Sequence, residues 1–190
     1  MKVGIYGGTF DPVHLGHLQV AQAAIEELGL DRLFFVPAGQ SPFKAENVIT
    51  SSAVRLQLLR LALAGRTNCE IDEQEIRRGG TSYAIDTVRD YANRFSGAQL
   101  FYVIGADNIS RLNEWKDAAA LAGLVEFAAV PRPGSVPAPF PQPFRGRVLK
   151  GPLVDISSSE IRERIKAGLP IGQLVPADVG EFIRNNGLYL

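Results

Sequence analysis

Two histidines separated by three positions are the residues of this sequence with the clearest capacity for chemistry. His14 and His17 are the only histidines among the 190 residues, and they belong to the segment GGTFDPVHLGH, which begins at Gly7. Side chains three residues apart share one face of a helix, so both imidazoles can point toward the same ligand. Their N–H groups could then stabilise the negative charge that builds on phosphate oxygens during a transfer reaction.

The glycine pair in front of the histidines also suits an anion. Gly7 and Gly8 end an apolar run, and helical spacing of apolar residues starts at Leu18. Backbone without Cβ atoms lets a phosphate approach, and the N–H groups at a helix start attract negative charge. A plain turn capped by Asp11 and a structural histidine pair are the alternatives. A zinc site would lack ligands, because the chain has one cysteine and no third histidine.

A second polar group, ISSSEIR, runs from Ile156 to Arg162 at another predicted helix start. Ser157 and Glu160 fit a capping box, which is a purely structural interpretation. The capping box leaves Ser158 and Arg162 unexplained, and the helix dipole disfavours a cation at this end unless an anion is bound. From the residues alone, a helix cap and a phosphate site both remain open.

Three single residues are further candidates, each with a structural alternative. Lys44 follows a strand and a proline-containing loop, so it could reach a phosphate or stay in solvent. Asp107, in GADN from Gly105, could accept a hydrogen bond from a ribose or cap a helix. Trp115, the only tryptophan, could be a core residue or a stacking platform. The P-loop and the glycine-rich dinucleotide fingerprint are both absent.

The elements that must position these residues follow from the hydrophobic pattern. Buried strands are expected at 2–6, 32–36, 69–71, 100–104 and 124–130, with extended pieces at 147–149 and 154–156. Helices are expected from Leu18 to a stop at Gly29, from Ser51 or Ser52 to Gly65, and over 82–92, 158–167 and 178–185. Pro131 to Pro143, which holds six of the 12 prolines, is expected to be a surface loop.

This alternation predicts the fold class α/β: a single doubly wound, Rossmann-like domain over residues 1–190, with a mainly parallel sheet flanked by helices. A small helical C-terminal part is expected from about residue 157 to 190. Open α/β sheets bind ligands where their strands end, and GGTFDPVHLGH follows the first strand.

Composition excludes several classes of partner. Lysine plus arginine number 20 and aspartate plus glutamate number 20, so no net positive field would attract a nucleic acid polymer or a membrane. The single Cys69 cannot form an internal disulfide, and no apolar run reaches the roughly 18 residues of a membrane span. The first residues lack the apolar segment of a signal peptide, so a cytoplasmic protein is expected. A homo-oligomer remains possible.

With both motifs identified, the sequence resembles a known superfamily. GGTFDPVHLGH and ISSSEIR resemble the two signature motifs of nucleotidyltransferases with a histidine–x–glycine–histidine signature. Within them, RRGGTSYAIDTV from Arg77, IGADN and Trp115 resemble bacterial nicotinate mononucleotide adenylyltransferases over nearly the whole chain. That resemblance implies adenylyl transfer from ATP to nicotinate mononucleotide in NAD biosynthesis, giving nicotinate adenine dinucleotide and pyrophosphate. The alternatives are a phosphopantetheine adenylyltransferase type of reaction, although that family lacks the SYAIDT segment, and a regulatory module that binds adenine nucleotides without catalysis.

The resemblance also implies roles for individual residues. The ATP phosphates would be held by Gly7, Gly8, Thr9, Phe10, His14 and His17. Gly105 and Asp107 would lie beside the adenosine, and Ser157, Ser158 and Arg162 would hold the departing pyrophosphate. The mononucleotide would contact Lys44, Trp115 at its ring, the backbone N–H groups of Thr81 and Ser82 at its carboxylate, and Arg132 at its phosphate. His14, His17, Lys44 and Arg162 would be the catalytic residues.

One position departs from the family pattern. The family's proline–histidine–lysine run reads Pro42, Phe43 and Lys44 in this chain, so a role of that histidine does not carry over.

The implied reaction needs little proton transfer. A nucleotide phosphate is already anionic at neutral pH, so the protein must mainly align and neutralise the reactants. Mg²⁺ is expected to arrive on ATP with most of its waters rather than in a metal site of the protein. Hydrogen-bond donors between Gly79 and Ser82 would favour a ring carboxylate over a ring amide.

Overall fold

The computed structural model describes residues 1–40, 50–131, 133–134, 136–151 and 155–190. Within this part of the chain, six strands form one sheet in the order β3-β2-β1-β4-β5-β6, and every neighbouring pair is parallel. The strands are β1 (Lys2–Gly8), β2 (Arg32–Pro37), β3 (Cys69–Ile71), β4 (Gln99–Gly105), β5 (Glu126–Val130) and β6 (Gly146–Val148). The prediction of an α/β fold with a parallel sheet is confirmed.

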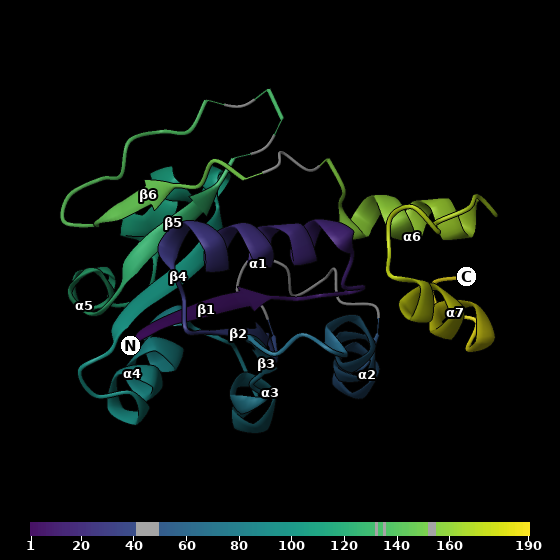
Figure 1. Cartoon of the computed structure of the whole chain (residues 1–190), viewed down its shortest axis with the longest axis horizontal. Coiled ribbons are helices and arrows are strands. Elements are labelled where there is room, and N and C mark those ends of the chain that lie inside the picture. Colours follow the sequence, from purple (N-terminus) through teal and green to yellow (C-terminus); the bar gives the residue numbers. More distant parts are fainter. Residues whose placement is uncertain (41–49, 132, 135, 152–154) are drawn as a thin grey trace.

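Helices cover both faces of this sheet (Figure 1). One face packs against α1 (Leu15–Leu28) and α2 (Ser52–Leu63), and the same apolar cluster continues into α6 (Ser158–Lys166) and α7 (Ala177–Asn185). The other face packs against α4 (Ala84–Arg94), the 3-10 helix η2 (Ala106–Glu114) and α5 (Ala118–Leu124). The short helix α3 (Gln74–Arg78) follows β3.

The four inner strands β1, β2, β4 and β5 are largely buried on both faces, which explains their continuous apolar runs. In β1, Val3 and Ile5 are fully buried in the cluster beneath α4 and η2. In β2, Leu33 and Phe35 are fully buried in the cluster beneath α1 and α2. Because β1 is central, the loop that follows it lies between the two layers of helices.

The helix limits refine the predictions. α1 begins at Leu15 rather than Leu18, because His14 takes the extended N-cap position, and it ends at Gly29, whose φ is 63°. Ser51 is the N-cap of α2, and its Oγ accepts a hydrogen bond from the Val54 N–H at 3.3 Å. The strand expected from residue 124 starts only at Glu126, because Leu124 is the last residue of α5.

The remaining segments complete the comparison. The described residues between 131 and 143 lie in neither helix nor strand, as the proline content predicts, whereas the extended piece expected at 154–156 lies partly outside the described residues. None of the helices among the described residues has the length and apolar character needed to cross a membrane.

Candidate active site

A cavity of ≈ 490 Å³ lies where β1 and β4 end. In the sheet order 3-2-1-4-5-6, β2 and β3 lie on one side of β1, and β4, β5 and β6 lie on the other. The connections after β1 and β4 therefore leave in opposite directions, which opens a crevice between the carboxyl ends of these two strands. The strand ends and the adjoining loops line it together: Tyr6 to Thr9, Ala38, Tyr102 to Gly105, Ser82 to Ala84, Glu75, Asn108 and Glu114 to Lys116. The glycine motif therefore borders this cavity.

The glycine pair is required by packing inside the protein itself. A Cβ on Gly7 would come 2.6 Å from the Tyr102 hydroxyl, and a Cβ on Gly8 would come 2.8 Å from the ring of Phe10. Phe10 has a φ of 52°, and only 1% of it is exposed. Its buried ring offers no surface to a ligand, so any contact of this residue with ATP must come from its backbone.

The two imidazoles are stacked, with ring centroids 3.6 Å apart and planes at 30°. The backbone N–H of His14 donates to Nδ1 of His17 at 3.2 Å, which leaves Nε2 to carry the proton when that ring is neutral. His17 also packs against Phe10, with ring centroids 5.0 Å apart. The spacing therefore places both rings together at the start of α1.

Burial sets the charge of the first imidazole. His14 is 5% exposed, and desolvation lowers its pKa from 6.5 to about 4. Its Nδ1 is buried and has no hydrogen-bond partner among the described residues. His14 is therefore neutral at pH 7 in the unliganded protein.

The structure brings the second motif to the first. Arg162 donates from Nη1 to the carbonyl of Asp11 at 2.8 Å, and the Ser158 hydroxyl donates to the carbonyl of Pro12 at 2.9 Å. Ser157 caps α6, since its Oγ accepts from the Glu160 N–H at 3.1 Å. The cap and the proximity to a phosphate site are thus compatible, because different side chains of the motif supply them.

On the other side of the cavity, one expectation is wrong. The backbone N–H of Ser82 donates to the carbonyl of Gln40 at 2.8 Å, so it is not offered to a ligand carboxylate. Its hydroxyl accepts from the N–H of Gly39 at 2.9 Å. Thr81 forms a bridge with Gln40, so both residues join the loop after β2 to the start of α4.

Of the two remaining candidates in this part of the site, Trp115 lines the cavity and Asp107 does not. Trp115 lines the cavity and is edge-on to Tyr102 and Phe127, with centroids 6.0 and 6.1 Å away. Asp107 is exposed in η2, two residues after Gly105, which itself lines the cavity. Lys44, Arg132 and the divergent Phe43 lie outside the described residues.

Arg55 is a functional candidate that the sequence reasoning missed. It is 1% exposed on α2 and donates to the carbonyls of Thr9 and Ala38, both at 2.8 Å, and to Ser52 Oγ at 3.1 Å. Burial lowers its pKa from the ordinary arginine value, while the negative charge of Asp11 opposes that change. The available signal was an arginine on the same helical stripe as Leu58, Leu59 and Ala62.

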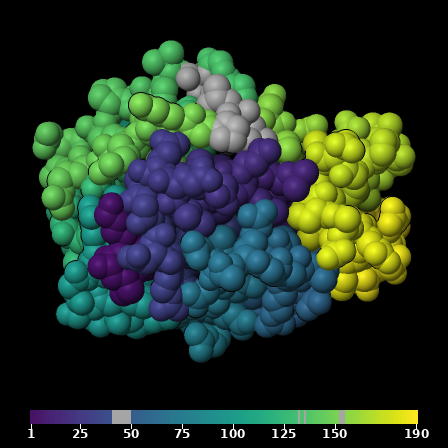
Figure 2. Space-filling view, in the orientation of Figure 1, coloured from purple at the N-terminus to yellow at the C-terminus, as the bar shows by residue number. Residues whose placement is uncertain are grey.

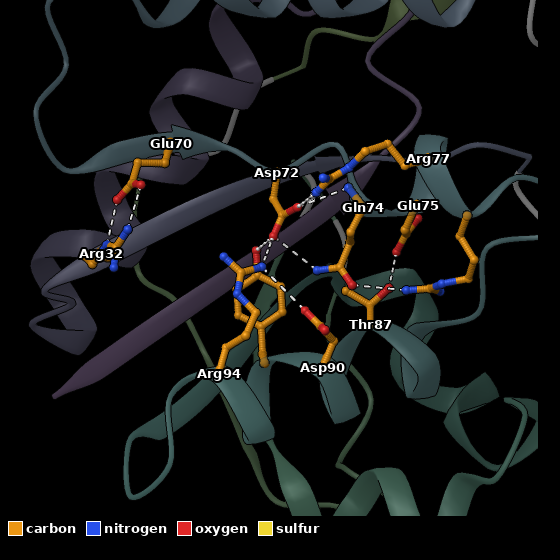
Figure 3. Close-up of polar contacts among 11 residues, drawn as sticks. Arg32, Glu70, Asp72, Gln74, Glu75, Arg77, Thr87, Asp90 and Arg94 are labelled. Carbon is orange, nitrogen blue, oxygen red and sulfur yellow. Dashed lines mark hydrogen bonds and ion pairs between the residues drawn. The ribbon is translucent and has the colours of Figure 1, made fainter.

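Glu75 is a second missed residue. It is 4% exposed, lines the cavity, and accepts a hydrogen bond from the Thr87 hydroxyl at 2.5 Å (Figure 3). Burial raises its pKa, and hydrogen bonds from Thr87 and Ser82 only partly offset this. Its helix is five residues long, too short for periodicity to reveal that it is buried.

Metal ligands are sparse in the site. Over the residues that the structure describes, no three His, Cys, Asp or Glu side chains are grouped so that they could hold a metal ion.

Comparison with known proteins gives a consistent family. Residues 5–164 match the family described as cytidylyltransferase-like. The chain is 41% identical over 198 residues to the probable nicotinate-nucleotide adenylyltransferase of Opitutus terrae, covering 100% of this chain and 98% of that protein. It is 39% identical over 189 residues to the nicotinate-nucleotide adenylyltransferase of Bacillus subtilis, covering 99% and 98% respectively.

Solved structures agree on the fold. Plasmodium falciparum nicotinic acid mononucleotide adenylyltransferase complexed with NaAD has a TM-score of 0.80 and 17% identity, over 99% of this chain and 97% of that chain. The same enzyme complexed with APC has a TM-score of 0.77 and 17% identity, over 99% and 96%.

Proposed function

This chain belongs to the cytidylyltransferase-like family, among the nicotinate-nucleotide adenylyltransferases, and on that premise we propose that its cavity transfers the adenylyl group of ATP to nicotinate mononucleotide. An oxygen of the mononucleotide phosphate attacks the α-phosphorus of ATP. The bond from that phosphorus to the bridging oxygen of the β-phosphate breaks, and pyrophosphate leaves. The product is nicotinate adenine dinucleotide.

The observation that carries this proposal is the meeting of the two motifs at one loop. Arg162 and Ser158 donate hydrogen bonds to the carbonyls of Asp11 and Pro12, which lie three and two residues before His14 in sequence. A triphosphate at the start of α1 would thus meet the imidazoles and the positive end of the helix dipole on one side and a guanidinium on the other. These groups are donors and positive dipoles, which suit a reaction that needs charge neutralisation.

We assign the remaining contacts by their position. The ATP phosphates lie along Gly7 to Phe10 and receive hydrogen bonds from His14 and His17, while Gly105 and Asp107 adjoin the adenosine. The pyrophosphate meets Ser157, Ser158 and Arg162. The nicotinate ring lies against Trp115, near Ser82 in the cavity wall and its neighbour Thr81. Lys44 and Arg132 lie outside the described residues, and the family resemblance alone assigns them to the mononucleotide.

Mg²⁺ belongs to this proposal as a companion of ATP. Phosphate oxygens and water are its preferred ligands, so the ion can enter the site on the triphosphate. When bound it neutralises charge on the triphosphate. Positioning of the reactants falls to the side chains already named.

Product analysis tests the proposed reaction. The protein is incubated with ATP, Mg²⁺ and one acceptor: nicotinate mononucleotide, nicotinamide mononucleotide or phosphopantetheine. We expect stoichiometric pyrophosphate and nicotinate adenine dinucleotide with the first acceptor and slower turnover with the second. Transfer only to phosphopantetheine, or ATP binding without pyrophosphate release from any acceptor, would contradict the proposal.

A further inference from the structure

Starting from the proposed function, we infer that Tyr189 is a positioning residue for ATP: its hydroxyl holds Asp11 and thereby fixes the loop between the glycine pair and the histidines. The Tyr189 hydroxyl donates to Oδ1 of Asp11 at 2.7 Å, across 178 positions of sequence. Asp11 is 1% exposed and Tyr189 is 5% exposed. Tyr189 does not line the cavity, so it acts through the loop.

Asp11 is the point where several distant segments converge. Its carboxylate also accepts from the hydroxyl of Thr50 at 2.5 Å and from the Thr50 N–H at 3.4 Å. Its carbonyl accepts from Arg162 at 2.8 Å. A shift of Asp11 would therefore move the guanidinium that we assign to the pyrophosphate.

The surrounding packing shows how Tyr189 reaches this loop. The C-terminal residues, yellow in Figure 2, pack against the segment that contains α2 and against the start of α1. Val179 and Ile183 of α7, together with Tyr189, belong to the same apolar cluster as the leucines of α2. This apolar packing of α7 and Tyr189 against α2 positions the Tyr189 hydroxyl at Asp11.

The loop needs such support because its backbone is strained. Phe10, next to Asp11, has a φ of 52°, a conformation that is unfavourable for a bulky residue. A buried carboxylate that loses one hydroxyl donor is also less well satisfied. Small displacements of positioned groups in an active site can reduce turnover by up to about 10²-fold.

The test compares two tyrosines that make the same type of bond. Tyr189→Phe removes the hydroxyl at Asp11, and Tyr91→Phe removes an equivalent buried hydroxyl that donates to Asp72 at 2.8 Å, outside the lining of the cavity. Both substitutions keep the ring and its packing. We expect Tyr189→Phe to lower kcat/KM for ATP about tenfold and to weaken ATP binding, with KM for the mononucleotide unchanged. Tyr91→Phe is expected to lower Tm alone.

Thr50→Val provides an independent route to the same carboxylate if Tyr189→Phe folds poorly. It should reproduce the selective loss toward ATP. Wild-type kinetics in folded Tyr189→Phe, or equal losses for both substrates, would overturn the inference. Calorimetry on the same proteins measures how the loop affects ATP affinity, independently of turnover. If the wild-type protein binds ATP but catalyses no reaction, that result contradicts the proposed function and not the role of Tyr189.

Discussion

His17 is the side chain on which we expect the chemical step to depend most. Its ring is held by the His14 N–H and by Phe10, so its remaining nitrogen has a fixed direction. His17→Ala should lower kcat by about 10²–10³-fold, in line with the loss of one oxyanion donor, with a smaller change in ATP affinity. Steady-state kinetics and calorimetry measure the two effects, and Gln19→Ala, an exposed change on the same helix, is the control. An unchanged kcat would remove His17 from the mechanism.

His14 should make stability depend on pH. Because its pKa is lowered to about 4 from 6.5, the unfolded chain takes up a proton before the folded protein does. The free energy of unfolding therefore keeps the full contribution of neutral His14 above pH 6.5. As the pH falls from 6.5 to about 4, the free energy of unfolding decreases by about 3 kcal/mol. Chemical denaturation at several pH values measures it, and His14→Gln should flatten the dependence.

The same histidine should report ligand binding. The negative charge of a bound triphosphate favours the imidazolium, so ATP should raise the pKa of His14. NMR titration can follow this in a chain with two histidines, and a His17→Gln variant assigns the resonances. A pKa insensitive to ATP would contradict contact between this ring and the phosphates.

At the residue level, the sequence named candidates that belong to local motifs and missed those defined by tertiary contacts. The histidine pair, Ser158 and Arg162 could be named as candidates because their spacing is local. Arg55 and Glu75 could not be named, because the hydrogen-bond partners of these buried side chains are carbonyls and hydroxyls distant in sequence. The Ser82 N–H failed for the same reason: its partner Gln40 is not visible from the chain order.

At the level of elements, α2 joins the loops that follow two neighbouring strands. Arg55 bridges Thr9 after β1 and Ala38 after β2, so its guanidinium sets the distance between them. Arg55→Met keeps the volume but leaves two carbonyls without this donor, and we expect a loss of about 3 kcal/mol in unfolding free energy. Arg60→Met, on the same helix but in an exposed pair with Glu73, should cost below about 1 kcal/mol.

Denaturant titration of both variants measures the difference, and kinetics should show that only Arg55→Met impairs turnover. Equal stability of the two variants would mean that the bridge contributes nothing. Arg55→Lys should rescue little, because one ammonium lacks the forked donors that reach two carbonyls.

The predictability of elements followed their length and regularity. The long strands and the helices with clear caps at Ser51, Ser157 and Gly29 were predicted within a few residues. The helices α3 and α5 were not predicted, because they are only five and seven residues long. The nine-residue η2 was missed because a 3-10 helix has about three residues per turn, which the 3.6-residue spacing does not match.

For the whole molecule, Asp72 links β3, α3 and α4 away from the cavity (Figure 3). Burial alone would raise its pKa, but hydrogen bonds from Arg94, Tyr91 and the Gln74 N–H together lower it. Because the pKa of Asp72 is lower in the folded protein, the ionised carboxylate stabilises the fold at pH values above the ordinary aspartate pKa of 3.8. This stabilisation is lost as the pH falls below 3.8.

Asp72→Asn should therefore destabilise the protein at pH 7 and approach wild-type stability in strong acid. Thermal unfolding across that range checks the trend, with Asp178→Asn at an exposed position of α7 as the control. A constant difference at every pH would show that the charge of Asp72 is not responsible.

The bond between Tyr189 and Asp11 also bears on how the protein is made. At about 5–20 residues per second, a ribosome needs roughly 10–40 s to add the 178 positions that separate the two side chains. Until then the nascent polypeptide carries its glycine and histidine segment without the hydroxyl that holds it. Newly made chains should consequently gain nucleotide affinity only after residue 189 has been added, well after the first strands and helices have emerged.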